Sequence, residues 1–160
     1  MLRILSLDPS GTGKTGICLI NGKKITFQQY QSPEWKKHYA FISQLVQAEQ
    51  SNLVLYETTN YINSRGKDMT SLFRLMGALE WLPVKLDSIL VHQVKDLKAK
   101  LLAGTKQIPH LTCQPGRGKG WMFKGKRISL HQLDAYLVYY LWKERQRTCF
   151  EFSGKEEKHE

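Results

Sequence analysis

Two short apolar runs that each end in an acid constrain the fold of this chain more than any other feature. Residues 4–7 are followed by Asp8, and residues 53–56 are followed by Glu57. Such runs predict buried central strands of a sheet. Ligand-binding and catalytic groups gather at the carboxyl ends of such strands. If the two strands are parallel neighbours, the two carboxylates lie side by side, although each acid could also simply cap the turn that follows it.

The order of the predicted elements indicates an α/β fold. Strands are predicted over residues 3–8, 16–20, 24–30, 53–57 and 88–91. The pair Asn21-Gly22 predicts a hairpin with a type I′ turn between the second and third strands. Helices are predicted from Ser32 onward and over residues 66–82, 92–102 and 129–143, with a small ribbon over 120–128 that turns at Lys124-Gly125. We therefore expect a mixed five-stranded sheet with helices on both faces.

The length of 160 residues predicts one domain, which we place at residues 1–146, with an exposed C-terminal tail at 147–160. No apolar run is long enough to span a bilayer, and the first residues are too short a run for a signal peptide. We therefore expect a cytoplasmic protein with no membrane partner. The three cysteines lack the spacing of zinc ligands, so reduced thiols are expected.

A third acid, Asp134, lies in the middle of the apolar face of the last predicted helix. A carboxylate directed into a core is costly unless it is paired or binds a metal ion. His131 lies three residues earlier on the same side of the helix. Two alternatives remain: a buried hydroxyl or Arg74 could satisfy Asp134, and His131 could be an ordinary half-buried histidine.

Three carboxylates brought together repel one another and hold raised pKa values unless a cation neutralises them. Carboxylate oxygens suit Mg²⁺ or Mn²⁺. Two such ions, roughly 3.5–4 Å apart, can activate a water molecule and stabilise the leaving oxygen of a phosphodiester. Asp8, Glu57 and Asp134 therefore predict a site for Mg²⁺ or Mn²⁺, with two ions expected.

The positive charge of the chain is concentrated in one stretch. The net charge is +10, and residues 95–127 hold nine Lys or Arg side chains against the single acid Asp96. A surface of this charge density favours a polyanion as partner, although a merely soluble basic face is the alternative. The rings of Tyr61, Trp121 and Phe123 could stack on unpaired bases; a role in the core or in anchoring a loop is equally open for each.

Four segments in order resemble the RuvC-type Holliday-junction resolvases, members of the ribonuclease H-like superfamily. These segments are "ILSLDPSGTGKTGICLI", "LVLYET", "VHQVKDLKAKLLAGTKQI" and "HQLDAYLVYYLW". Two departures concern substrate preference: Ser10 stands where the family usually has Gly, and residues 113–127 form a Gly/Arg/Lys loop in place of a helical segment.

The resemblance implies a ribonuclease H-like fold and a crossover junction endodeoxyribonuclease that nicks opposite strands of a four-way junction as a homodimer. It implies that the metal ligands or activators are Asp8, Glu57, His131 and Asp134. Lys95 becomes a further catalytic residue, and Lys106 is placed with it near the scissile phosphate. The helix over 66–82 is a candidate dimer surface, or an ordinary core helix. Together with the charge pattern, the expected nucleic-acid-binding residues are Tyr61, Lys95, Lys106, Arg117, Lys119, Trp121, Lys124, Lys126 and Arg127.

Other functions are compatible with parts of the sequence. The segment "SGTGKT" suggests a phosphate-binding loop, but that motif requires Gly where this chain has Asp8. Actin- and hexokinase-like ATPases begin similarly but need two such domains, so no nucleotide cofactor is expected. A YqgF-type nuclease of structured RNA shares the fold and the acids. A nucleic-acid-binding domain without catalytic activity is the remaining alternative.

Overall fold

A computed structural model describes residues 1–59, 67–114 and 120–153. A five-stranded sheet runs through its centre in the order β3-β2-β1-β4-β5. Its strands are β1 (Arg3–Asp8), β2 (Lys14–Asn21), β3 (Lys24–Gln31), β4 (Leu53–Thr58) and β5 (Lys85–Leu90). β1 pairs in parallel with β4, and β4 with β5, whereas β1–β2 and β2–β3 are antiparallel. The expected mixed five-stranded sheet is therefore confirmed.

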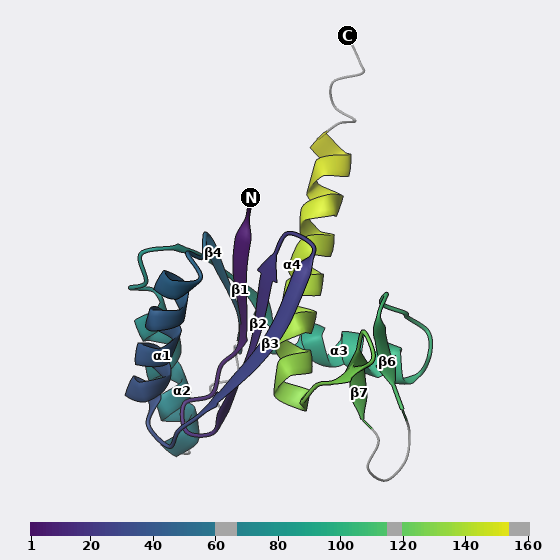
Figure 1. Cartoon of the computed structure of the whole chain (residues 1–160). Coiled ribbons are helices and arrows are strands. Elements are labelled where there is room, and N and C mark those ends of the chain that lie inside the picture. Colours follow the sequence, from purple (N-terminus) through teal and green to yellow (C-terminus); the bar gives the residue numbers. More distant parts are fainter. Residues whose placement is uncertain (60–66, 115–119, 154–160) are drawn as a thin grey trace.

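Helices cover both faces of this sheet, as predicted, and Figure 1 shows the sheet between them. α1 (Trp35–Ala48) and α2 (Lys67–Leu79) pack on one face, and α4 (Leu130–Ser153) packs on the other. The side chains of β1 and β4 alternate between two separate cores. Leu5, Leu7 and Val54 face α1 and α2, whereas Ile4 and Leu55 face α4. Period-two alternation thus assigns every residue of these strands to one helical layer.

The α4 face carries two further elements. α3 (Val91–Leu102) starts directly after β5 and packs against α4. A small antiparallel sheet consists of β6 (Leu111–Cys113), β7 (Trp121–Phe123) and β8 (Lys126–Arg127). The predicted ribbon is thereby confirmed, including its turn at Lys124 and Gly125, which both have positive φ. Its third strand, β6, was not expected from the sequence.

Several boundaries differ from the expected ones. The hairpin between β2 and β3 turns at Gly22-Lys23, because Asn21 pairs with Lys24, and only Gly22 in that turn has positive φ. The type I′ turn centred on Asn21-Gly22 was therefore wrong, although the hairpin itself is present. α1 begins at Trp35. Just before it, the backbone amide of Glu34 donates a hydrogen bond to Ser32 Oγ.

The last helix is longer than predicted. It does not end at residue 143 but continues to Ser153, so part of the expected tail is helical. Arg147, Thr148 and Cys149 are exposed on this extension. No helix among the described residues has the length and apolar character that crossing a membrane would require. The three cysteines form no disulfide, and Cys18 is buried.

Candidate functional site

Two of the predicted acids end adjacent parallel strands. Leu7 of β1 pairs with Tyr56 of β4, so the residues that follow them, Asp8 and Glu57, stand next to each other at the carboxyl edge of the sheet. Both continue the alternation that points Ser6 and Leu55 toward α4. The strands are thus the parallel neighbours on which side-by-side carboxylates depended, and the register directs both acids to the face that α4 covers.

Two close contacts hold the first turns of α4 against the sheet. Ser6, fully buried in β1, donates a hydrogen bond from Oγ to the carbonyl oxygen of Ala135 at 2.7 Å. Gly16, the register partner of Asp8, lies so close to α4 that a Cβ atom there would be 1.9 Å from the carbonyl oxygen of His131. Only glycine permits this approach, and the approach brings His131 and Asp134 to the acids of the sheet.

His131 contacts the first of these acids. Its Nδ1 lies 2.8 Å from Oδ2 of Asp8, whose side chain is 18% exposed. Because the ring nitrogen must carry a proton to donate to the carboxylate, this contact fixes one tautomer of a neutral imidazole or uses a charged one. His131 is therefore a direct neighbour of Asp8, a contact that the shared helical face with Asp134 did not by itself predict.

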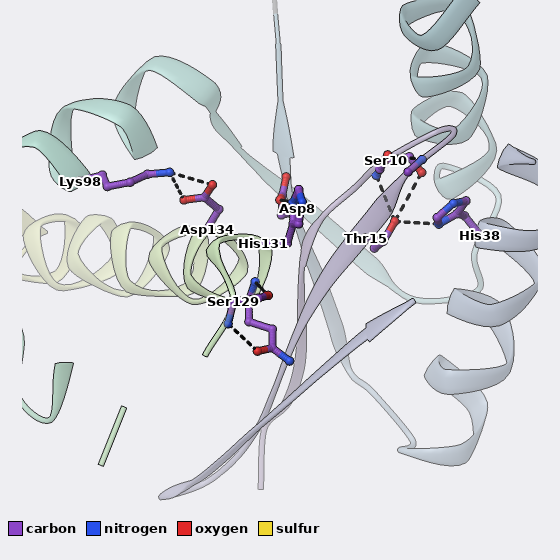
Figure 2. A network of polar contacts seen from close by, with 10 residues as sticks. Asp8, Ser10, Thr15, His38, Lys98, Ser129, His131 and Asp134 are labelled. Atoms are coloured by element: carbon purple, nitrogen blue, oxygen red, sulfur yellow. Dashed lines mark hydrogen bonds and ion pairs between the residues drawn. The ribbon is translucent and has the colours of Figure 1, made fainter. Parts of the chain in front are cut away.

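Asp134 is paired with a cation from a neighbouring helix. Figure 2 shows Lys98 reaching from α3 to Asp134 on α4. Lys98 Nζ is 2.8 Å from Oδ2, in hydrogen-bond geometry, and 2.6 Å from Oδ1. The contact with Oδ1 satisfies the distance but not the angle, so this buried oxygen has no hydrogen-bond donor. Arg74, the partner considered from the sequence, is not the one that satisfies Asp134.

The pKa values of Asp8 and Glu57 are raised, as expected for carboxylates that lie close together. Burial, together with the charges of Asp8 and Asp134, raises the pKa of Glu57 to about 8. Burial also raises the pKa of Asp8, against the hydrogen bond from His131, which lowers it. That same hydrogen bond raises the pKa of His131. The site thus concentrates negative charge that a cation would relieve.

The carboxylate oxygens at this edge are ligands that a hard divalent cation prefers. They are not, however, arranged as a complete coordination shell. The buried Oδ1 of Asp134 without a donor and the repelling pair Asp8 and Glu57 are what such an ion would satisfy. Yet among the described residues no group of three or more His, Cys, Asp or Glu side chains is close enough to hold one ion. Two of the acids are instead engaged by side chains of the protein, Asp8 by His131 and Asp134 by Lys98.

A cavity of about 470 Å³ opens beside the two strand-end acids. Its polar rim includes Asp8, Glu57 and Lys95, the last an exposed residue of α3. Its other wall is apolar and includes Met69, Leu72 and Met76 of α2 together with Val91. Lys95 is therefore placed beside the acids, as the resemblance implied, at the mouth of a pocket that one face of α2 lines.

The loop after Asp8 is fixed by a buried network that sequence reasoning missed. Thr15 Oγ1 accepts a hydrogen bond from the backbone amide of Ser10 and lies 2.9 Å from Nδ1 of His38, which is fully buried on α1 (Figure 2). His38 Nε2 donates to the carbonyl oxygen of Ser32 at 2.8 Å. Thr15 lies in strand β2 rather than at the start of a helix, which agrees with rejecting a phosphate-binding loop.

Apart from Lys95 and Trp121, the predicted nucleic-acid-binding residues fall into three groups. Tyr61, Arg117 and Lys119 lie outside the described residues. Lys124, Lys126 and Arg127 are all exposed on the β7–β8 ribbon. Lys106 is half-buried, with its Nζ 5.7 Å from the ring centre of Tyr140 on α4.

The structure corrects the expectation for Trp121. Its ring is only 7% exposed, because the ribbon turns its apolar side chains inward against the α4 core. Phe123 is buried in the same way and meets Phe27 and Tyr136 edge-on. Both rings anchor the ribbon, which was the alternative to stacking on bases. The ribbon therefore offers its charges, and not these rings, to the surroundings.

Comparisons with solved structures agree with this architecture. RuvC from Thermus thermophilus, solved in complex with a Holliday junction substrate, matches with a TM-score of 0.57 and 11% identity over 86% of this chain and 90% of that one. The yeast mitochondrial Holliday junction resolvase Ydc2 matches with a TM-score of 0.53 and 14% identity over 94% and 84% of the two chains. No protein-family model and no curated protein sequence matches. The expected ribonuclease H-like fold of RuvC type is thereby confirmed.

Proposed function

We propose that this chain is a divalent-metal-dependent endonuclease that cleaves phosphodiester bonds in branched DNA, with four-way junctions as its substrate. One observation carries the proposal. Burial and the nearby charges of Asp8 and Asp134, both distant in sequence, raise the pKa of Glu57 to about 8. The fold is the one found in two junction resolvases, and a stretch rich in Lys and Arg supplies affinity for a polyanion.

The proposed role of each residue follows from its position in the site. Asp8, Glu57 and Asp134 would hold Mg²⁺ or Mn²⁺, with two ions expected, and His131 would act as a ligand or a water activator beside Asp8. The bound ions supply an activated water and charge stabilisation at the leaving oxygen. Lys95, at the rim of the cavity with Asp8 and Glu57, would bind the scissile phosphate. Lys106, Lys124, Lys126 and Arg127 would contact the phosphates of the DNA arms.

The test is a cleavage assay with four substrates in Mg²⁺ or Mn²⁺: a four-way junction, a linear duplex, a structured RNA and ATP. We expect paired nicks near the junction centre only. Asp8→Asn and Glu57→Gln should each lower the cleavage rate by about a thousandfold, since several kcal/mol of charge stabilisation are lost, while junction binding persists. Cleavage of the RNA alone, as in a YqgF-type nuclease, or turnover of ATP would refute the proposal.

One observation favours a different function. Because the described acids form no group that could hold an ion as they are placed, the chain could bind branched nucleic acid without cutting it. The same assay separates the two functions. A wild-type chain that binds the junction but leaves it intact in both metals would establish the non-catalytic alternative.

We also propose that the chain acts as a homodimer, because two nicks on opposite strands need two sites. Leu75 and Leu79 of α2 are buried in the core of the subunit, whereas Met69, Leu72 and Met76 line the cavity. α2 is thus a core helix in part, and its remaining surface is the candidate dimer contact. The molar mass measured by light scattering, with and without junction DNA, tests this state.

A further inference from the structure

α3 brings two lysines to the acid cluster, and the second has no place in the roles proposed above. Lys95 lines the cavity with Asp8 and Glu57, and Lys98 follows one helical turn later. Lys98 does not face the cavity but contacts Asp134, as Figure 2 shows. Its side chain is 25% exposed and that of Asp134 18%, so the ion pair is only partly open to solvent.

We propose that Lys98 is a built-in counter-ion for Asp134, which a divalent cation must displace in order to use Asp134 as a ligand. The inference rests on the metal site of the proposed function. It concerns the charge balance of that site before a metal ion binds. Lys98 acts through Asp134 and is a positioning residue.

The contact geometry shows why both cations cannot use Asp134 together. The ammonium nitrogen lies 2.6 and 2.8 Å from the two carboxylate oxygens and therefore spans both of them. An ion bound to either oxygen would stand within a few ångströms of the ammonium, and like charges at that separation repel strongly in a partly buried site. Lysine is suited to withdrawal, because its charge is carried on a flexible four-carbon stem.

Lys98 also balances the rest of the cluster. Its charge lowers the pKa of Asp8 and of Glu57, although burial and the neighbouring acids keep both raised. Among the described residues it is the only lysine in an ion pair with one of the three acids. The metal-free site is thus kept partly neutral by a side chain of the protein itself.

Two consequences of opposite sign follow when this charge is removed. Without Lys98, the metal-free chain should be less stable, since Asp134 is left largely buried without its partner. Metal binding should become tighter, since no cation has to leave. A lysine with a purely structural role would move both quantities in the same direction, because a disordered site both lowers stability and binds metal poorly.

The experiment uses the full chain and Lys98→Met, which keeps the aliphatic stem and removes the charge. Mn²⁺ is titrated calorimetrically into the metal-free proteins. We expect Lys98→Met to lower the dissociation constant for Mn²⁺ roughly tenfold and to lower the melting temperature of the metal-free chain. Lys98→Arg, which keeps the charge, should bind Mn²⁺ no more tightly than the wild type does. Lys100→Met, a change at an exposed lysine of the same helix, should alter neither quantity.

Repeating the comparison in a chain that carries Asp134→Asn makes the test specific. With Asp134→Asn already present, most of the gain from Lys98→Met should disappear, because the competed ligand is gone and only the weaker effect of the charge on Asp8 and Glu57 remains. The inference is overturned if Lys98→Met binds Mn²⁺ no more tightly than the wild type, or if its full gain survives in the Asp134→Asn background. If Mn²⁺ affinity is unchanged while junctions are still cleaved, only the counter-ion role fails. If neither protein binds Mn²⁺, the metal site itself, and with it the proposed function, fails.

Discussion

On the side of the sheet that α1 and α2 cover, the buried side chains of β1 and β4 are the apolar or aromatic Leu5, Leu7, Val54 and Tyr56. On the α4 side the same two strands carry Ser6, Asp8 and Glu57 between their apolar residues. Burying acids costs stability, whereas burying apolar surface contributes it. Both faces therefore carry an apolar core, but only the α4 face also gives up stability to hold buried acids.

The sharpest test of this difference is a matched pair of glycine substitutions. Gly16→Ala on the α4 side would place a Cβ atom 1.9 Å from a backbone oxygen of α4, whereas Gly77→Ala on α2 would meet nothing within 4 Å. We expect Gly16→Ala to destabilise the chain by about 4 kcal/mol, at the severe end of single substitutions. Gly77→Ala should stabilise it by about 0.5 kcal/mol. Urea denaturation of both variants measures this, and equal effects would contradict the close approach of α4.

The second test removes apolar packing from the other face. Leu79 of α2 is fully buried in the core beneath α1 and α2. Leu79→Ala should cost about 3 kcal/mol of stability because it leaves a cavity. Junction cleavage, assayed well below the melting temperature, should stay within about twofold of the wild type. A large loss of cleavage by a folded Leu79→Ala chain would show that the two faces are not independent.

The third test uses pH. The pKa of Glu57 is raised from 4.5 to about 8 in the folded chain, so the folded state binds this proton more tightly than the unfolded state does. The resulting stability is present below pH 4.5 and is lost as the pH rises toward 8. In metal-free buffer, Glu57→Gln should remove a loss of roughly 2 kcal/mol over that interval, a value reduced for partial exposure. Denaturation curves from pH 5 to 9 that are the same for both proteins would contradict the assignment.

The smallest expected effect concerns the exposed ribbon. Replacing Lys124, Lys126 and Arg127 by Ala should leave stability within about 0.5 kcal/mol, because all three are exposed. The dependence of junction affinity on salt should flatten by about one unit for each phosphate that the variant no longer neutralises. Lys36→Ala with Lys37→Ala, on the exposed surface of α1, is the control of similar charge and should leave that dependence unchanged. If both sets act alike, binding is not confined to the α4 side.

The strands along the chain, the acids at the strand ends and the helical layers were predictable because each depends on local pattern. Apolar runs ending in Asp8 and Glu57 predicted buried central strands, and period-three-to-four spacing placed His131 and Asp134 on one side of a helix. The register then brought these residues together. Turn detail was less predictable: the hairpin shifted by one residue to Gly22-Lys23, since pairing along β2 and β3 extends to Asn21 and Lys24.

What the sequence did not reveal were partners that depend on how distant elements pack. Lys98 was one basic residue in a helix full of them, and only the packing of α3 on α4 gives it Asp134 as partner. Nothing in the sequence indicated that His38 and Thr15 contact each other, because that contact depends on how α1 is placed beside β2. Trp121 gave the opposite error, since an aromatic ring in a basic stretch suggested a binding surface while the small sheet buries it. Its position two residues before Phe123 in an alternating run was the available signal.

α4 is one uninterrupted helix that is held at its first turns and again just beyond its midpoint. Its first turns hold His131 and Asp134 and are tied to β1 by Ser6, while farther along Trp142 and Arg145 bind Asp87 of β5. Eleven residues separate Asp134 from Arg145 along the helix, which is about 16 Å at 1.5 Å per residue. Because the helix is held at both places, a shift of one attached segment strains the contacts of the other. The edge strand β5 therefore shares in setting where Asp134 stands, so variation at Asp87 is expected to reach the acid cluster without touching it.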